Sequence, residues 1–201
     1  MRTVDPARHR QRRQQIVEAA LACFAEKGFH ATRTAEICQR VGMSPGNLFH
    51  YFDSKDAIIE EVIEQDRHEA ARLYAALRER EDHYAALLEL LDLCLELVCQ
   101  RDYGALSLEI AAEATRNPRM ARLFERDDAQ IKADLSALLS DAVRGGQIDA
   151  SLPIESATVW LLALLEGALF RAAVDPDFDL ARERATLHGL IERWLRPTGV
   201  R

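Results

Sequence analysis

The chain has 201 residues, of which 48% are hydrophobic and 6% aromatic, a composition that fits a helical protein with a buried core and excludes a disordered one. Its net charge is −7, yet residues 1–55 carry nine Lys or Arg against five Asp or Glu, so the acidic excess lies in the remainder. This asymmetry predicts a basic contact region on an acidic body.

The first predicted helix runs from about residue 8 to Lys27, with Ile16, Ala20 and Phe24 along one stripe. Gly28 is expected to end it, because glycine adopts the left-handed conformation that often follows a helix. The helix is therefore expected to be amphipathic, with its apolar stripe turned toward the core.

Residues 32–56 predict two short helices around a glycine turn. Thr32 is expected to cap the first helix, and Gly42 to supply the positive φ that ends it. Ser44 and Pro45 are expected to be the N-cap and first residue of the second. Such a pair is the helix-turn-helix unit, whose second helix enters a DNA major groove.

The rest of the chain is also helical in pattern. We expect helices over about 55–78, 82–98, 104–115, 118–144, 154–174 and 179–195. Strand alternation is absent from the sequence, which predicts an all-α fold of about nine helices. We expect an N-terminal three-helix helix-turn-helix domain (1–55) and a C-terminal helical bundle for ligand binding and dimerisation (56–201). The helix after Ser54 is expected to be a stiff connector.

Four cysteines, at positions 23, 38, 94 and 99, lack CxxC spacing and lie in apolar patterns. We interpret them as buried thiols in a reducing cytoplasm, with no metal site and no cofactor. The amino end has no apolar signal core, and the longest apolar run, 157–165, is shorter than the ~20 residues of a membrane helix. The chain is therefore expected to be cytoplasmic, without a membrane partner.

The segment 32–55 resembles the TetR family of bacterial transcriptional regulators. The matching residues are Thr32, Ile37, Val41, Gly42, Met43, Ser44, Gly46, Leu48, Phe49, His50, Tyr51, Phe52, Ser54 and Lys55. The resemblance covers about the first quarter of the chain, and the remainder matches only in length and helical character. It implies a homodimeric repressor that binds a palindromic double-stranded DNA operator and is released by a small-molecule inducer of unknown identity. Activation instead of repression stays open.

The candidate DNA-binding residues fall into two sets. Groove-lining candidates are Ser44, Pro45, Gly46, Asn47, Phe49 and His50, among which Asn47 suits adenine and Phe49 a thymine methyl. The resemblance implies phosphate contacts from Thr32, Arg33, Tyr51 and Lys55. Phe49 departs from the family, which usually has tyrosine there. Arg8, Arg10, Arg12 and Arg13 form either an arm that reaches DNA or a disordered tail.

The resemblance also implies an inducer pocket among the middle helices. Candidate lining residues are Leu91, Cys94, Leu95, Val98, Glu109, Met120, Phe124 and Trp160. Glu109, Glu113 and Glu166 interrupt apolar faces, and a buried carboxylate needs a partner. That partner is either a cationic ligand or one of Arg116, Arg122 and Arg171.

Two apolar stripes near the carboxyl end predict a dimer interface. They consist of Trp160, Leu161, Leu164, Leu165, Ala168, Leu169, Leu187, Leu190, Ile191 and Trp194. Stripes this apolar are expected to be covered, either by a second copy across a two-fold axis or by the core of the same chain.

Two other functions were considered. A helical enzyme is disfavoured because the sequence has no HExxH, paired ExxH, phosphate-loop or nucleophile-elbow motif. A helix-turn-helix protein that acts through protein contacts or nonspecific DNA binding stays open, and it differs from a regulator in its preference between operator and random DNA.

Overall fold

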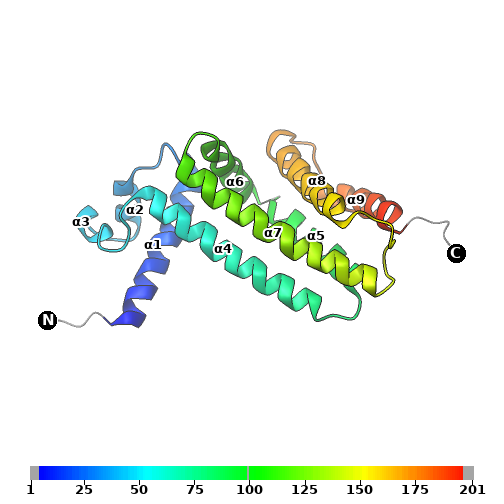
Figure 1. Cartoon of the computed structure of the whole chain (residues 1–201). Coiled ribbons are helices and arrows are strands. Elements are labelled where there is room, and N and C mark those ends of the chain that lie inside the picture. The colour runs from blue at the N-terminus through cyan, green and yellow to red at the C-terminus, as the bar shows by residue number, and fades with distance from the viewer. Residues whose placement is uncertain (1–4, 99, 197–201) are drawn as a thin grey trace. The chain divides into compact units, whose positions relative to one another are not determined.

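The structure is a computed structural model that describes residues 5–98 and 100–196. Within these ranges it contains nine helices and no strand, which confirms the all-α prediction (Figure 1). The helices are α1 (Pro6–Lys27), α2 (Thr34–Arg40), α3 (Pro45–Leu48), α4 (Lys55–Arg78), α5 (His83–Val98), α6 (Arg101–Ala114), α7 (Pro118–Arg144), α8 (Ile154–Val174) and α9 (Leu180–Leu195).

Polar side chains cap the first turns of α4, α5 and α7. Ser54 Oγ accepts a hydrogen bond from Ala57 N–H (3.1 Å), and an Asp82 carboxylate oxygen accepts one from Ala85 N–H (2.8 Å). The Asn117 side chain similarly accepts from Arg119 N–H at 3.0 Å. These side chains satisfy the N–H groups that the first helical turn leaves unpaired.

The chain divides into two compact units. The first comprises the described residues up to 67 together with 105–124, and the second comprises 68–104 and those from 125 onward. The predicted functional boundary at residue 55 is therefore not the boundary of a compact unit. A three-helix unit this small buries little apolar surface, and its core is completed by α4 and α6.

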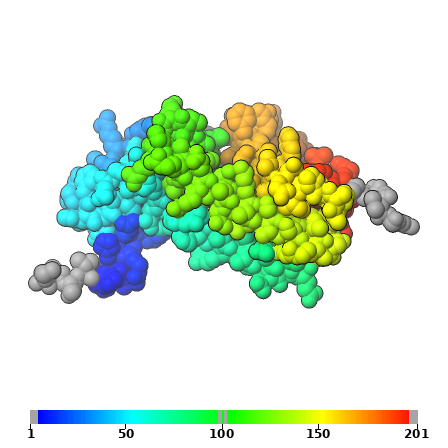
Figure 2. All heavy atoms as spheres, viewed as in Figure 1, coloured from blue at the N-terminus to red at the C-terminus, as the bar shows by residue number. Residues whose placement is uncertain are grey.

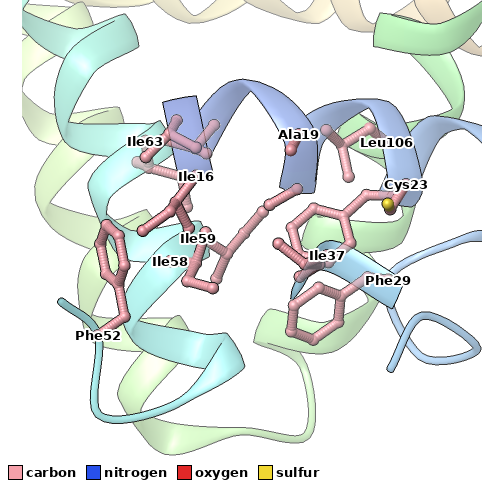
Figure 3. Close-up of a cluster of buried hydrophobic side chains, with 14 of the residues drawn as sticks. Ile16, Ala19, Cys23, Phe29, Ile37, Phe52, Ile58, Ile59, Ile63 and Leu106 are labelled. Atoms are coloured by element: carbon pink, nitrogen blue, oxygen red, sulfur yellow. The ribbon is translucent and has the colours of Figure 1, made fainter. Parts of the chain in front are cut away.

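The core of the first unit gathers side chains from α1, α2, α4 and α6 (Figure 3). Ile16, Ile37 and Ile58 are fully buried there. Phe24 meets Phe29 edge to face, with ring centroids 5.2 Å apart. Burial of these side chains fixes α2 on α1, which gives the following turn and α3 a firm base.

The second unit is a helical bundle in which α5 packs against α8 and α9. Leu87, Leu138, Leu161 and Ile191 are fully buried in its core. Arg78 Nε on α4 and Asp141 Oδ2 on α7 form an ion pair of 2.6 Å. This arginine lowers the pKa of the Asp141 carboxyl below its ordinary value.

The described cysteines are free thiols. Cys23 and Cys38 are buried, as predicted, whereas Cys94 is only half-buried; burial raises the pKa of its thiol to about 11. Cys99 lies outside the described residues. Among the described residues no group of His, Cys, Asp or Glu is suited to hold a metal ion.

Candidate nucleic-acid interface

The segment between α1 and α2 differs from the predicted capping pattern. The residue at the N-cap of α2 is Arg33, whose N–H donates to Glu36 Oε2 at 2.8 Å. Thr32 instead turns inward, and its hydroxyl lies 3.0 Å from Cys23 O and 2.8 Å from Gly28 O. The prediction that Thr32 caps α2 is therefore wrong, because its hydroxyl binds the carbonyl end of α1.

The turn between α2 and α3 follows the prediction. Gly42 has a φ of +64°, the left-handed conformation that lets the chain leave α2. Ser44 is the N-cap of α3, with its Oγ accepting from Asn47 N–H at 3.3 Å, and Pro45 is the first helical residue. Proline suits this position because its nitrogen has no proton to leave unpaired.

The recognition helix is short and is continued by turns. After α3 ends, Tyr51 N–H donates to Leu48 O (2.8 Å), and so does Phe52 N–H (3.0 Å). Leu48 and Phe52 are buried. The helical course up to Phe52 thus packs one side into the core and leaves the other side exposed.

The groove-lining candidates lie together on this exposed side. Ser44, Pro45, Gly46, Asn47, Phe49 and His50 are all exposed. The Phe49 ring has half of its surface open to solvent (50%), which is unusual for a large apolar side chain and leaves it free for an apolar contact. One short segment therefore presents an amide, an imidazole and an aromatic ring on the same surface.

Two basic residues of α1 bind the backbone on either side of α3. Arg13 donates to Tyr51 O (2.6 Å) and pairs with Glu61 on α4 (2.5 Å), and its guanidinium lies 4.1 Å from the Phe52 ring centroid. Arg12 donates to Val41 O at 3.0 Å. The expectation of a disordered tail is wrong, because α1 begins at Pro6 and holds these residues in a helix. Contact of the arginines with DNA stays a prediction.

Arg8 and Arg10 also belong to α1, and both are exposed. The Asp5 side chain caps this helix by accepting from Ala7 N–H at 3.0 Å. The sequence contained this signal, since Asp before Pro is a common helix start.

The four phosphate candidates differ in their access to solvent. Arg33 is exposed, and Tyr51 is half-buried with its ring stacked on His9 at 4.8 Å between centroids. The Thr32 side chain is buried, so its predicted phosphate contact has no exposed hydroxyl to carry it. The phosphate prediction is also unsupported for Lys55, whose Nζ donates to Phe29 O and, at 3.0 Å, to Thr32 O. Burial lowers the pKa of this lysine.

The predicted inducer-pocket residues divide between the two compact units. Leu91 is buried in the core of the second unit, and Met120 is buried in the core of the first; Leu95 is also buried. Cys94 is half-buried, whereas Phe124 and Trp160 are exposed (41% and 63%), so the last two line no closed cavity within a unit. The side chain of Val98 lies outside the described residues.

The carboxylates also have other partners than predicted. Glu109 Oε2 accepts a hydrogen bond from Phe29 N–H, and Glu113 lies 2.7 Å from His30 Nε2. Glu166 is exposed on α8. The predicted pairing with Arg116, Arg122 or Arg171 is therefore wrong for Glu109 and Glu113, because the segment after α1 supplies their partners.

The predicted dimer stripes divide between core and surface. Leu161 and Ile191 are fully buried in the core of their own unit, so their assignment to a dimer interface is wrong. Trp160, Leu164 and Leu190 are exposed (63%, 37% and 49%), and the atoms of α8 are open to view in orange in Figure 2. The remaining five, Leu165, Ala168, Leu169, Leu187 and Trp194, are half-buried. Three apolar residues of α8 that the predicted stripes do not include are also half exposed: Val159, Phe170 and Val174.

One described helix, α8, is long and apolar enough to cross a membrane on length and composition alone. The prediction that no segment reaches this length is wrong, because the apolar pattern continues beyond Glu166 to Val174. Core helices of soluble proteins meet the same criterion. Its exposed apolar side chains do, however, need a covering surface.

An exposed recognition segment on a packed helix-turn-helix, joined to a helical bundle, defines a DNA-binding transcriptional regulator. Residues 16–62 match the family described as bacterial regulatory proteins, tetR family, and residues 80–196 match BetI-type transcriptional repressor, C-terminal. The chain therefore belongs to the TetR family of bacterial transcriptional regulators.

Relatives support this assignment along most of the chain. The HTH-type transcriptional regulator UidR of Escherichia coli (strain K12) is 33% identical over 179 residues, which cover 89% of this chain and 88% of that protein. The HTH-type transcriptional repressor AcnR of Corynebacterium glutamicum is 27% identical over 161 residues, covering 80% and 81%. The structure of Salmonella enterica GusR matches 96% of this chain and 100% of its own, with 33% identity and a TM-score of 0.70.

Proposed function

We propose that this regulator is a cytoplasmic homodimer that represses transcription by occupying a two-fold symmetric operator, and that a small molecule releases it. The exposed surface of α3 carries this proposal. Its backbone is held in place by the hydrogen bond from Arg13 to Tyr51 O and by the burial of Leu48, so the surface is formed before DNA arrives. Preformed surfaces bind without the entropic cost of ordering flexible side chains.

We assign recognition of the DNA bases to Asn47, Phe49 and His50. An asparagine amide can donate to and accept from adenine in the major groove, and an exposed phenylalanine ring can contact a thymine methyl. Arg33 and Tyr51 then remain as phosphate contacts at the edge of the interface. Phosphate contacts orient the protein on the duplex, while the base contacts distinguish sequences.

Dimerisation is assigned to the exposed apolar side chains of α8 and α9. A short recognition helix reads few bases, so specificity requires a second copy on the next half-site, about 34–36 Å away along the duplex. Trp160, Leu164 and Leu190 offer a surface that such a copy would cover. Burial of this surface also explains why α8 is apolar without crossing a membrane.

We assign binding of the releasing ligand to residues 56–201, the ligand-binding domain expected from the sequence. Operator binding is lost if the ligand prefers a conformation in which the two recognition helices no longer match successive grooves. A coupling of about 1–3 kcal/mol between the two sites is typical of such control. The helix α4 connects the parts, since it begins beside the helix-turn-helix and continues into the second unit.

Selection from a randomised duplex pool tests the function. The full chain is expected to enrich one palindromic sequence and to bind it at least about 10³-fold more tightly than random DNA. Multi-angle light scattering should give twice the chain mass of 22.7 kDa. Enrichment of no sequence, with equal affinity for every duplex, would support the nonspecific alternative instead.

A further inference from the structure

The segment between α1 and α2 is held from two sides. On one side, Glu109 of α6 accepts a hydrogen bond from the backbone N–H of Phe29. On the other, Lys55 at the start of α4 donates to the carbonyl oxygens of Phe29 and Thr32, and its Nζ lies 4.3 Å from the Phe29 ring centroid. Opposite charges thus bind opposite polar groups of the same short stretch of backbone.

Gly28 makes room for the carboxylate. Its φ of +84° is one that other residues rarely adopt. A Cβ atom at this position would also overlap the Glu109 carboxylate, with the side-chain Cδ only 3.0 Å away. The glycine therefore serves the close approach of α6 as well as the end of α1.

This segment determines where α2 begins. Arg33 is the N-cap of α2, and the preceding Thr32 binds the end of α1 through its hydroxyl. The helix α2 in turn carries Gly42 and α3. A shift of the segment consequently moves the base on which the recognition surface rests.

We propose that Glu109 is a positioning residue for DNA binding, which acts through the Phe29 amide to hold the helix-turn-helix in its DNA-binding arrangement. Glu109 itself belongs to α6 and not to the helix-turn-helix. Its helix, α6, begins in the second unit and ends in the first, so the chain connects the bundle directly to this hydrogen bond. The inference deepens the proposed function, since it names a residue that sets operator affinity.

The test compares Glu109→Ala with Glu109→Gln in the full chain, using the duplex selected by the unaltered protein. The alanine variant is expected to bind about tenfold more weakly and to exchange the Phe29 amide proton faster, because the acceptor is lost. The glutamine variant keeps a carbonyl oxygen of similar reach and should remain within about threefold of the unaltered protein. Glu125→Ala, an exposed position on α7, is the matched control.

If Glu109 had a merely structural role, Glu109→Ala would lower the melting temperature, but operator affinity measured well below that temperature would not change. Unchanged affinity of the alanine variant, together with faster exchange at Phe29, would overturn the proposal, as would an equal loss in the glutamine variant. Failure of the unaltered protein to select any duplex is a different result, which rejects the proposed function itself.

A double-mutant cycle with Gly28→Ala gives an independent measure. The added Cβ should disturb operator affinity more when Glu109 is present than in the Glu109→Ala background, where the overlap is removed. Additive losses would contradict the contact on which the proposal rests.

Discussion

At the scale of single residues, Arg13 fixes the end of the recognition segment through its backbone. Its guanidinium binds Tyr51 O and Glu61 and lies over the Phe52 ring, so it uses the planar fork that lysine lacks. We expect Arg13→Lys to lower the free energy of unfolding by about 1–3 kcal/mol, as for lost hydrogen bonds to charged groups. Chemical denaturation measures the loss; Arg10→Lys, exposed on the same helix, should change it by less than about 0.5 kcal/mol.

The ion pair between Arg78 and Asp141 gives stability that depends on pH. The folded-state pKa of Asp141 is lowered, so its carboxylate stabilises the fold above its unfolded value of about 4, and this contribution disappears as the pH falls below that value. We expect Asp141→Asn to lower the melting temperature at pH 7 and to have a progressively smaller effect as the pH falls below about 4. Asp128→Asn, which removes a more exposed pair with Lys132, is the control and should cost less at pH 7. A melting difference for Asp141→Asn that is constant with pH would contradict the pairing.

At the scale of helices, local sequence signals predicted most of the fold. Gly28, Gly42, Ser54 and Asp82 act within a few residues of their own positions, so their roles are visible in the sequence. Seven long helices were expected, and each was found within a few residues of its predicted ends.

The contacts that local patterns missed join residues far apart in the chain. Glu109 binds the backbone of Phe29, and Lys55 binds the same segment from the other side. Backbone groups are the same at every residue, so nothing in the sequence identifies which amide a distant carboxylate will meet. The buried and exposed sides of α8 could not be told apart from the sequence either, because the helix has apolar residues all round.

Substitution of Asn47 tests whether the recognition helix distinguishes DNA bases. Asn47→Ala keeps the Ser44 cap, because the bond uses the backbone N–H of Asn47, and it removes only an exposed amide. We expect operator affinity to fall by about 1–3 kcal/mol and discrimination at one base pair of each half-site to relax. The salt dependence of binding should not change, because no phosphate contact is lost. Fluorescence anisotropy over a panel of single-base variants measures these effects, and Gln39→Ala on α2 is the control. Retained discrimination at every position would show that Asn47 reads no base.

At the scale of the whole molecule, the apolar surface of α8 and α9 predicts assembly. Trp160 is 63% exposed, whereas the adjacent Leu161 is fully buried, so the two positions separate assembly from folding. Trp160→Asp is expected to give a monomer at micromolar concentration, because a charge would be buried in an apolar interface, while the helical content is retained. Ala76→Asp, at an exposed position on α4, introduces the same charge outside this surface and should leave the dimer intact.

Leu161→Ala should lose stability and not the dimer. We expect it to lower the free energy of unfolding by about 2–5 kcal/mol, because it leaves a cavity in the core. Light scattering and operator titration would be measured on all three variants. Because one half-site contributes only part of the specific binding energy, the Trp160→Asp monomer should bind the operator at least about 100-fold more weakly. A Trp160→Asp variant that remains dimeric would place the interface elsewhere, whereas a monomer with full operator affinity would show that one helix-turn-helix suffices.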